Sequence, residues 1–327
     1  MKKICVVTYV FGDKYQSFIP IFIYSVLKAY PDYYVKIYTD RALSSQLQEE
    51  LASICKMGSF EIISDCLTHV GLTQKALRYD QISKCVRWLY IDEDYEKYDA
   101  IYIGDIDIFM VQEKIPLFDQ HMIHAGIMQS CYSNFIREQQ IAKSFKNFIR
   151  FLLKYGLKET FKFFKTDGKI KKLSGLHFII TKDYLPLLEK YQKHYIEELN
   201  LLAESKSSKW NLCSFNNEHL LYCLIRDMQL FIPPNSHLSA RQVLEQTNPN
   251  EMAFRPFHGL HLGLWRKDKY GSLNGDTTIM DHDIYKEAYH YFKMLNDTDT
   301  ILQEMLLNNN YASEVIHNMI YYYEKEM

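Results

Sequence analysis

The sequence lacks several features that would place it in a specialised class of protein. It contains no stretch of about 18 apolar residues, which excludes a transmembrane helix. Its seven cysteines are scattered and form no CxxC pair, which argues against a zinc knuckle or a redox motif. We therefore expect the protein in a reducing compartment, the cytoplasm.

Charge of one sign is also missing. The sequence has 38 Lys and Arg against 40 Asp and Glu, a formal net charge of −2, so the bulk charge predicts no nucleic-acid partner. What is present is a globular composition, 47% hydrophobic and 24% charged. Aromatic residues make up 15%, with 26 Tyr, a residue type that suits sugar stacking although most copies serve packing.

Short apolar runs alternate with segments of helical periodicity through the first hundred residues. We expect strands at 3–10, 33–39, 60–64 and 99–103 and helices at 17–30, 43–56 and 74–93. Further along we expect strands at 121–130 and 174–181, a mainly helical segment at 135–172, helices at 184–205 and 215–228, a strand and loop at 251–265, and helices from about 280 onward. The alternation predicts an α/β fold with a doubly wound, mostly parallel sheet.

The layout of the chain follows from what separates these elements. The sequence shows no internal repeat, no low-complexity linker and no sharp change of composition. The simplest organisation is one domain over residues 1–279 with a helical appendage over residues 280–327.

The strongest motif is Gly104-Asp105-Ile106-Asp107, directly after the strand expected at 99–103. In an extended chain, carboxylates two residues apart lie on the same face. In parallel sheets ligands bind beyond the carboxyl ends of the strands, where these aspartates stand. Hard oxygen ligands there suit Mg²⁺ or Mn²⁺, and such an ion can bridge a diphosphate. An unpartnered pair of loop carboxylates is the plain alternative.

With this motif in place, the chain resembles the metal-dependent glycosyltransferases of the GT-A fold, the nucleotide-diphospho-sugar transferase type, and within them glycosyltransferase family 8. Several segments carry the resemblance in the same order along the chain. They are Thr8-Tyr9, Ser83 to Leu89 with Arg87, the Asp-x-Asp motif, Ser174-Gly175 with the strand after it, Asn216 to His219, and Phe257 to Trp265 with His258 and His261. The sequence departs from the family where Gly263-Leu264 replaces the usual Lys-Pro before Trp265.

The resemblance implies a role for each of these segments. Thr8 and Tyr9 would hold the nucleoside, Arg87 and Asp105 would bind the donor, and Asn217 and Glu218 would reach the donor sugar and the reaction centre. Asp105, Asp107 and either His258 or His261 would bind Mn²⁺ or Mg²⁺, and the spacing of the two histidines does not choose between them. The expected enzyme is a metal-dependent hexosyltransferase using a nucleotide sugar, a UDP-sugar, with retention of configuration.

The expected acceptor is a glycan or a lipid-linked glycan, as in bacterial surface polysaccharide or lipooligosaccharide synthesis. Lys146, Arg150, Lys154, Lys158 and Lys162 recur every four residues among phenylalanines. This pattern predicts an interfacial helix, with peripheral contact of residues 145–172 to the inner face of a membrane. The plain alternative is a solvated lysine face, broken at Gly156.

Two other functions compete with this one. A nucleotidyltransferase also uses paired aspartates on a doubly wound sheet, but it would normally carry a Gly-rich basic loop where this chain has Tyr9 to Lys14. A non-catalytic glycan-binding or partner-binding protein on a transferase fold is the other alternative. Intact aspartates and histidines argue against it.

Overall fold

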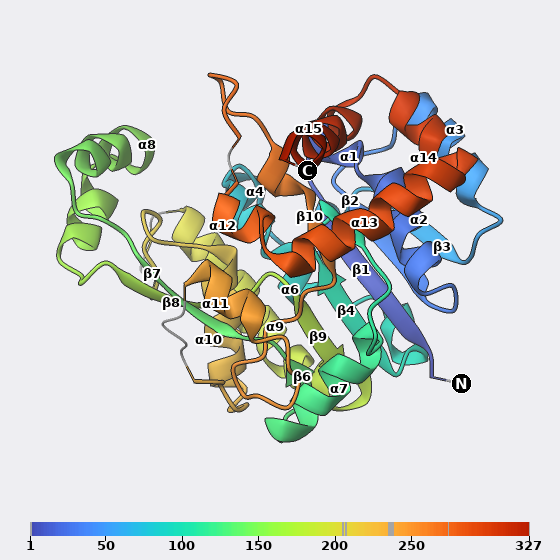
Figure 1. Ribbon diagram of the computed structural model, residues 1–327. Coiled ribbons are helices and arrows are strands. Elements are labelled where there is room, and N and C mark those ends of the chain that lie inside the picture. The colour runs from blue at the N-terminus through green and yellow to red at the C-terminus, as the bar shows by residue number, and fades with distance from the viewer. Residues whose placement is uncertain (1, 205, 207, 235–238, 274, 327) are drawn as a thin grey trace.

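The computed structural model describes residues 2–204, 206, 208–234, 239–273 and 275–326. Its centre is a mostly parallel six-stranded sheet, which confirms the predicted α/β class (Figure 1). In spatial order the strands are β3 (Phe60–Ile63), β2 (Tyr34–Thr39), β1 (Ile4–Val10), β4 (Ala100–Gly104), β9 (His177–Ile180) and β6 (Tyr132–Ser133). The first four run parallel, and β9 is antiparallel to both β4 and β6.

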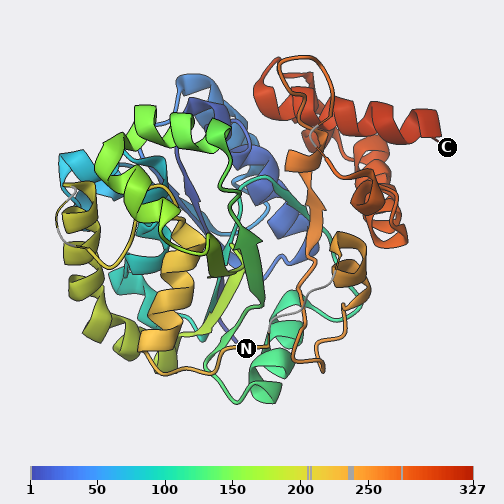
Figure 2. The same ribbon diagram turned by 90° about the vertical axis from the view of Figure 1, so that its left-hand side faces the viewer.

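Helices cover both faces of the sheet, as a doubly wound fold requires (Figure 2). Between the parallel strands lie α1 (Asp13–Gln16), α2 (Ile19–Ala29), α3 (Ser45–Ile54), η1 (Cys66–His69), α4 (Gln74–Leu77), α5 (Asp80–Ser83), α6 (Val86–Leu89) and η2 (Glu93–Lys97). The single helix predicted at 74–93 is wrong. Tyr79 takes an extended conformation that separates α4 from α5, so this segment is a chain of short helices.

The second half of the chain adds two small ladders and the remaining helices. Its elements are β5 (Ile108–Met110), α7 (Leu117–Ile127), β7 (Ile136–Gln140), α8 (Phe145–Phe164), β8 (Lys169–Leu173), α9 (Thr181–Ala203), α10 (Asn217–Asp227), α11 (Ala240–Glu245), β10 (Gly259–His261), η3 (Leu262–Trp265), α12 (Thr277–Met280), α13 (Asp283–Thr298), α14 (Thr300–Leu307) and α15 (Tyr311–Glu326). Strand β5 pairs with β10 and β7 with β8, both antiparallel.

One prediction for this half is wrong. The strand expected at 121–130 lies largely in helix α7, whose buried residues, Leu117 and His121 among them, recur at helical spacing. The segment 135–172 is mainly helical, as predicted, but the unpredicted strands β7 and β8 flank α8 on either side. Strand β8 buries Ile170 and Leu173 but leaves Lys169 exposed, and this short polar pattern concealed it.

Each face of the sheet has its own hydrophobic core, because side chains alternate along a strand. In β1, Val6 and Val10 enter one core, whereas Val7 and Tyr9 enter the other. The C-terminal helices α13, α14 and α15 belong to the first of these cores, where the Tyr323 ring lies 5.7 Å from that of Trp265. The division of the chain at residue 280 stays a prediction.

No described helix combines the length and the apolar composition that are needed to cross a bilayer.

Candidate active site

The candidate site lies at the carboxyl ends of β1 and β4, which are neighbours in the sheet. Thr8 is paired in register with Gly104, so the two predicted motifs begin side by side. Thr8 is fully buried and its Oγ1 has no hydrogen-bond partner. Tyr9 is packed inside, with its ring stacked on Tyr38 at 4.8 Å and its hydroxyl 3.0 Å from that of Tyr95. The nucleoside-binding role of Thr8 and Tyr9 stays a prediction.

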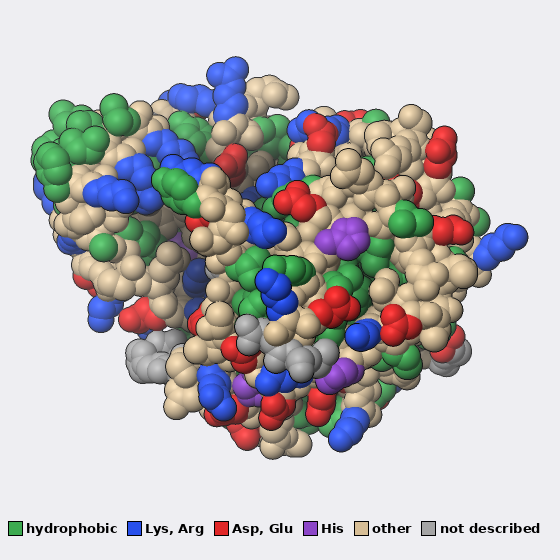
Figure 3. Space-filling view, turned by 45° about the horizontal axis from the view of Figure 1, so that its top comes forward, with side chains coloured by type: hydrophobic (Ala, Val, Ile, Leu, Met, Phe, Trp, Pro, Cys, Tyr) green, Lys and Arg blue, Asp and Glu red, His purple; other side chains and the backbone are tan. Residues whose placement is uncertain are grey.

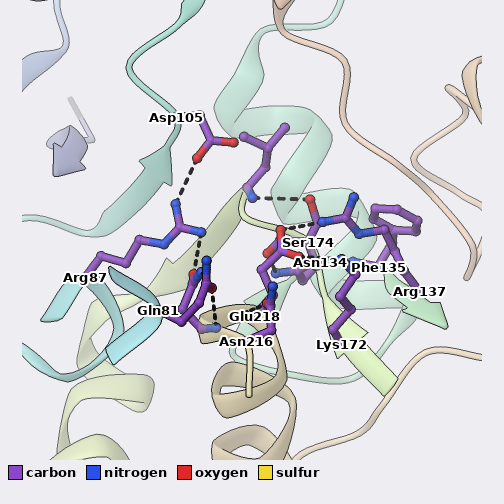
Figure 4. Close-up of polar contacts among 12 residues, drawn as sticks. Gln81, Arg87, Asp105, Asn134, Phe135, Arg137, Lys172, Ser174, Asn216 and Glu218 are labelled. Carbon is purple, nitrogen blue, oxygen red and sulfur yellow. Dashed lines mark hydrogen bonds and ion pairs between the residues drawn. The ribbon is translucent and has the colours of Figure 1, made fainter. Parts of the chain in front are cut away.

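The Asp105 carboxylate is held by an arginine from a distant segment. Arg87, on α6, donates from Nη1 to Asp105 Oδ1 at 2.8 Å (Figure 4). Its Nη2 donates to Asn217 Oδ1, also at 2.8 Å. Asn217, the first residue of α10, is fixed in turn by Trp88, whose Nε1 donates to its Oδ1 at 3.3 Å. Its Nδ2 donates to Gln81 Oε1 at 2.9 Å. Three segments predicted to belong to the site therefore meet here.

Glu218, the next residue of α10, is clamped between two cations. Its carboxylate pairs with the Arg137 guanidinium and, at 3.1 Å, with Lys172 Nζ (Figure 4). Arg137 and Lys172 face each other across the β7–β8 ladder. Burial by itself would raise the pKa of Glu218, but the charges of Arg137, Lys172 and Arg87 outweigh it, and the pKa is lowered. Glu218 is therefore an ionised carboxylate at neutral pH.

Gly175 marks the point where these groups converge. A methyl group added at its Cα would lie 3.0 Å from Arg87 Nη2, 3.3 Å from Asp105 Oδ2 and 3.3 Å from Glu218 Oε1. Both carboxylates and the guanidinium thus surround one small space, which glycine leaves open because it has no side chain.

Asp107 lies in a turn rather than in the extended chain that the Asp-x-Asp spacing suggested. Its Oδ1 is 3.3 Å from His261 Nε2, and its Oδ2 accepts from the Arg266 guanidinium, which also donates to the Tyr15 hydroxyl at 3.1 Å. Burial by itself would raise the pKa of Asp107, but the charges of His261 and Arg266 lower it well below its usual value. Burial would likewise lower the pKa of His261, but Asp107 raises it.

The two histidines that the sequence left as alternatives occupy different surroundings. His261 is 44% exposed beside Asp107. His258 is buried, with its Nε2 2.9 Å from His121 Nε2, in a cluster that also contains His124 and Ser133. Both histidines line the same cavity, and the structure brings only His261 against an aspartate of the motif.

The chemistry of the donors suits a divalent ion. Two carboxylates and an imidazole, from Asp105, Asp107 and His261, are ligands that Mn²⁺ accepts and Mg²⁺ tolerates. Over the described part of the chain, no three His, Cys, Asp or Glu side chains are arranged to hold a metal. Each carboxylate is instead paired with a guanidinium, Arg87 or Arg266, with which a metal ion would compete.

A cavity of about 120 Å³ opens beside these groups. Its lining includes Asp105, Gly175, Glu218, Arg255 and Tyr285. Burial and the nearby Arg137 lower the pKa of Arg255, whose guanidinium lies 5.0 Å from the centre of the Phe135 ring. A larger hollow of about 590 Å³ lies at the other end of the strands, beside Asp99 and Thr181, away from this chemistry.

Several residues of this site escaped the sequence analysis. They are Gln81, Arg137, Lys172, Arg255 and Arg266. Arg137 and Lys172 lie on strands within a segment predicted to be mainly helical. Their pairing across a β-ladder could therefore not be predicted from the sequence. The sequence held one signal for Arg266. Gly263-Leu264 replaces the Lys-Pro expected before Trp265, and Arg266 is the basic residue directly after Trp265.

No protein-family model and no curated protein matches the sequence. Among solved structures, the mannosyltransferase Ktr4p from S. cerevisiae in complex with GDP is 10% identical, with a TM-score of 0.43 over 71% of this chain and 67% of that chain. The galactosyltransferase LgtC in complex with donor and acceptor sugar analogs is 14% identical, with a TM-score of 0.37 over 82% and 91%.

A third similar structure is the glycosyltransferase GlyE in Streptococcus pneumoniae TIGR4, which is 12% identical, with a TM-score of 0.36 over 75% of this chain and 47% of that chain. These three similar structures are of glycosyltransferases. Likenesses this distant leave the activity to be argued from the site itself.

Proposed function

We propose that the protein is a metal-dependent glycosyltransferase that moves a hexose from a UDP-sugar to a glycan or lipid-linked acceptor in bacterial surface polysaccharide or lipooligosaccharide synthesis. One observation carries the proposal. At the carboxyl ends of the parallel strands, Asp105, Arg87 and Glu218 converge over Gly175 beside a single cavity. Ligands of open α/β sheets bind at this edge.

The proposed roles follow from the charges. Asp105, Asp107 and His261 would hold Mn²⁺ or Mg²⁺, with His258 as the other candidate ligand, and the bound ion would neutralise the diphosphate of the donor. Arg87 would share that work, and its contact with Asp105 supports this role. Thr8 and Tyr9 would contact the nucleoside, and Asn217 would orient the donor sugar.

Glu218 has the properties of a carboxylate that acts at the reaction centre. It is ionised, largely buried and faces the cavity. In the reaction the bond between the anomeric carbon and the β-phosphate oxygen breaks, and its electron pair leaves with the diphosphate. The oxygen of the acceptor hydroxyl forms the new bond, and its proton passes to the β-phosphate oxygen of the departing diphosphate. Glu218 would stabilise or attack the anomeric carbon while positive charge develops there.

The first test is nucleotide binding by calorimetry. We expect UDP to bind in the presence of Mn²⁺, and we expect EDTA or the Asp105→Asn/Asp107→Asn double variant to reduce the affinity at least about 100-fold, because the phosphates lose their counterion. The exposed pair Asp119→Asn/Asp183→Asn makes the same change of net charge away from the site and serves as the matched control. GDP is measured alongside UDP to test the base.

The second test separates the competing functions by their products. A glycosyltransferase releases a nucleoside diphosphate from a panel of sugar nucleotides. A nucleotidyltransferase instead releases pyrophosphate from a nucleoside triphosphate and a sugar phosphate. Metal-dependent binding with neither product favours a non-catalytic binding protein, and binding indifferent to metal and to both aspartates refutes the proposed site.

A further inference from the structure

Helix α8 stands apart from the rest of the molecule on an arm. The ladder of β7 and β8 leads away from the sheet and carries α8 at its end, at the left of Figure 1 and towards the viewer in Figure 2. We call residues 136–173, which comprise β7, α8 and β8, the α8 arm. Its base belongs to the candidate site, since Arg137 and Lys172 both contact Glu218.

The arm has a small core of its own. Gly156 interrupts α8 with a left-handed φ of 80°, so the helix folds back as two segments. Phe151 and Phe163, one from each segment, meet edge to face at 5.2 Å and are buried with Cys213. These contacts define which side of the arm faces inward.

The outward side exposes large apolar side chains. Phe145 is 80% exposed, Leu153 83% and Leu157 58%, and Ile149 and Phe161 are also exposed. Residues 145, 149 and 153 recur every four positions and therefore share one face of the helix. Folded soluble proteins seldom expose a contiguous apolar patch unless it meets a partner.

A basic stripe runs beside this apolar face. Lys146, Arg150 and Lys154 each follow one of the exposed apolar residues and are themselves exposed. Between residues 143 and 169 the arm has eight Lys and Arg against two acidic residues. One of these acids, Glu159, is buried and accepts a hydrogen bond from the Leu212 amide at 3.1 Å. Figure 3 shows hydrophobic side chains gathered at the outer edge of the molecule with Lys and Arg beside them.

The predicted stripe of five basic residues is shorter in the structure. Lys162 is half-buried, and its Nζ donates to the carbonyl oxygens of Ser208 at 3.1 Å and Trp210 at 2.6 Å. It anchors the arm rather than extending the exposed stripe. Three of the exposed basic residues, Lys146, Arg150 and Lys154, lie on the first segment of α8, before Gly156.

We propose that the outward face of the α8 arm docks on an anionic lipid bilayer. The apolar side chains enter the boundary between headgroups and acyl chains, while Lys146, Arg150 and Lys154 contact anionic headgroups. Exposed apolar residues beside a stripe of basic residues complement the apolar interior and the negative surface of an anionic bilayer. Docking stands independently of the enzymatic activity. Only its consequence, that a lipid-linked acceptor meets the site at the base of the arm, rests on the proposed function.

The experiment is vesicle flotation of the full chain. The vesicles contain either phosphatidylcholine alone or phosphatidylcholine with phosphatidylglycerol. We expect binding to the anionic vesicles that weakens as salt is raised, because screening shortens the reach of the charges. We expect the triple variant Lys146→Glu/Arg150→Glu/Lys154→Glu to lose on the order of 100-fold in affinity, since each basic residue near an anionic surface contributes about fivefold.

Matched controls remove the trivial explanations. The variant Lys182→Glu/Lys190→Glu/Lys193→Glu changes the net charge equally on exposed positions of α9, and we expect it to bind as the wild type does. Phe145→Ser/Leu153→Ser/Leu157→Ser removes apolar area, and we expect at least about a tenfold loss with the salt dependence kept. Its control, Tyr270→Ser/Met294→Ser/Leu307→Ser, alters residues that are as exposed elsewhere.

Some results would overturn the proposal. Equal binding to neutral and anionic vesicles, or no loss in the α8 variants, would show that this face does not dock on anionic lipid. A dimer in sedimentation velocity that the apolar variant dissociates, without vesicle binding by the wild type, would assign the face to a second copy of the chain. Nucleotide binding, measured on the same samples, reports on the candidate site separately from docking.

Discussion

Two clusters of buried charge in this protein are built in opposite ways. Around Lys36, which is 1% exposed, the ammonium lies 3.0 Å from Asp92 and 3.3 Å from Glu61, and Asp92 also accepts from the Tyr38 hydroxyl. Around Glu218, the acids are outnumbered. Arg87, Arg137, Lys172 and Arg255 surround Asp105 and Glu218.

The two clusters also differ in how completely their donors are satisfied. No buried polar atom of Lys36, Asp92 or Tyr38 is without a partner, whereas the Nε atoms of Arg87 and Arg137 have none. Over the part of the chain that the structure describes, no carboxylate pairs with Arg255. Native proteins satisfy most buried donors, so the unpaired guanidinium Nε atoms set the Glu218 cluster apart from the Lys36 cluster. Under the proposed function, the cations of the Glu218 cluster would attract an anionic donor, whereas the Lys36 cluster would contribute to stability.

The largest effect on stability is expected from breaking the Lys36 cluster. Lys36→Met leaves Asp92 buried without its cation, so we expect the free energy of unfolding to fall by about 3–5 kcal/mol in chemical denaturation. Lys28→Met serves as the control, because its pair with Asp299 is 34% exposed on the lysine side and contributes at most about 1 kcal/mol. Equal losses in both variants would contradict the comparison, as would a loss of UDP affinity in folded Lys36→Met.

The next largest effect, on turnover, is expected from removing the charge of Glu218 in the Glu218 cluster. We expect Glu218→Gln to lower donor turnover about 100-fold, equivalent to about 2.7 kcal/mol, while UDP affinity changes less than about threefold. Arg137→Gln is the control, since it removes the same ion pair but keeps the carboxylate. If Glu218→Gln retains turnover, or if both variants lose it equally in step with their stability, Glu218 serves the structure only.

A smaller effect is expected from filling the space between the charges. In Gly175→Ala the new methyl lies 3.0 Å from Arg87 Nη2, so the guanidinium must shift by a few tenths of an ångström. We expect turnover to fall about tenfold and the free energy of unfolding to change by less than about 1 kcal/mol. Gly126→Ala on α7, where a methyl meets nothing within 4 Å, is the matched control. Wild-type turnover in Gly175→Ala would show that the convergence has no catalytic importance.

The smallest expected effect near neutral pH is the pH dependence that the Lys36 cluster gives to the free energy of unfolding. Burial by itself would raise the pKa of Asp92, but the hydrogen bond from Tyr38 and the Lys36 ammonium outweigh it, and the pKa is lowered. Because the pKa of Asp92 is lower in the folded state, its ionised carboxylate stabilises the protein above the unfolded-state pKa of about 3.9. This stabilisation is lost as the pH falls through the folded-state pKa.

Equilibrium denaturation of the wild type and Asp92→Asn at several pH values measures this term. We expect a constant difference in the free energy of unfolding between pH 7 and pH 5, which shrinks below about pH 4 as Asp92 takes up a proton. Lys36 stays charged throughout, because burial lowers its pKa less than Asp92 and Glu61 raise it. A difference that does not change down to pH 3 would show that Asp92 gains nothing from its charge.

Local pattern accounts for the parts of the fold that were predicted. The strand at 99–103 and the aspartates that follow it are adjacent in the sequence, and their apolar spacing is read directly. The helix predicted at 215–228 corresponds to α10, with Asn216 capping it through a hydrogen bond from the Glu218 amide. Such features depend only on residues a few positions away in the sequence, so a single sequence is enough to predict them.

The sequence by itself determined the α/β class, the Asp-x-Asp at the end of β4 and the polar start of α10. Only the tertiary structure decided which partners these groups have. Arg87 and Asn217 are 130 positions apart, and Glu218 and Arg137 are 81 apart. It also decided that His261, not His258, stands against Asp107. Periodicity reports on contacts within one element, whereas the contacts between distant elements depend on the order of strands in the sheet, which periodicity does not encode.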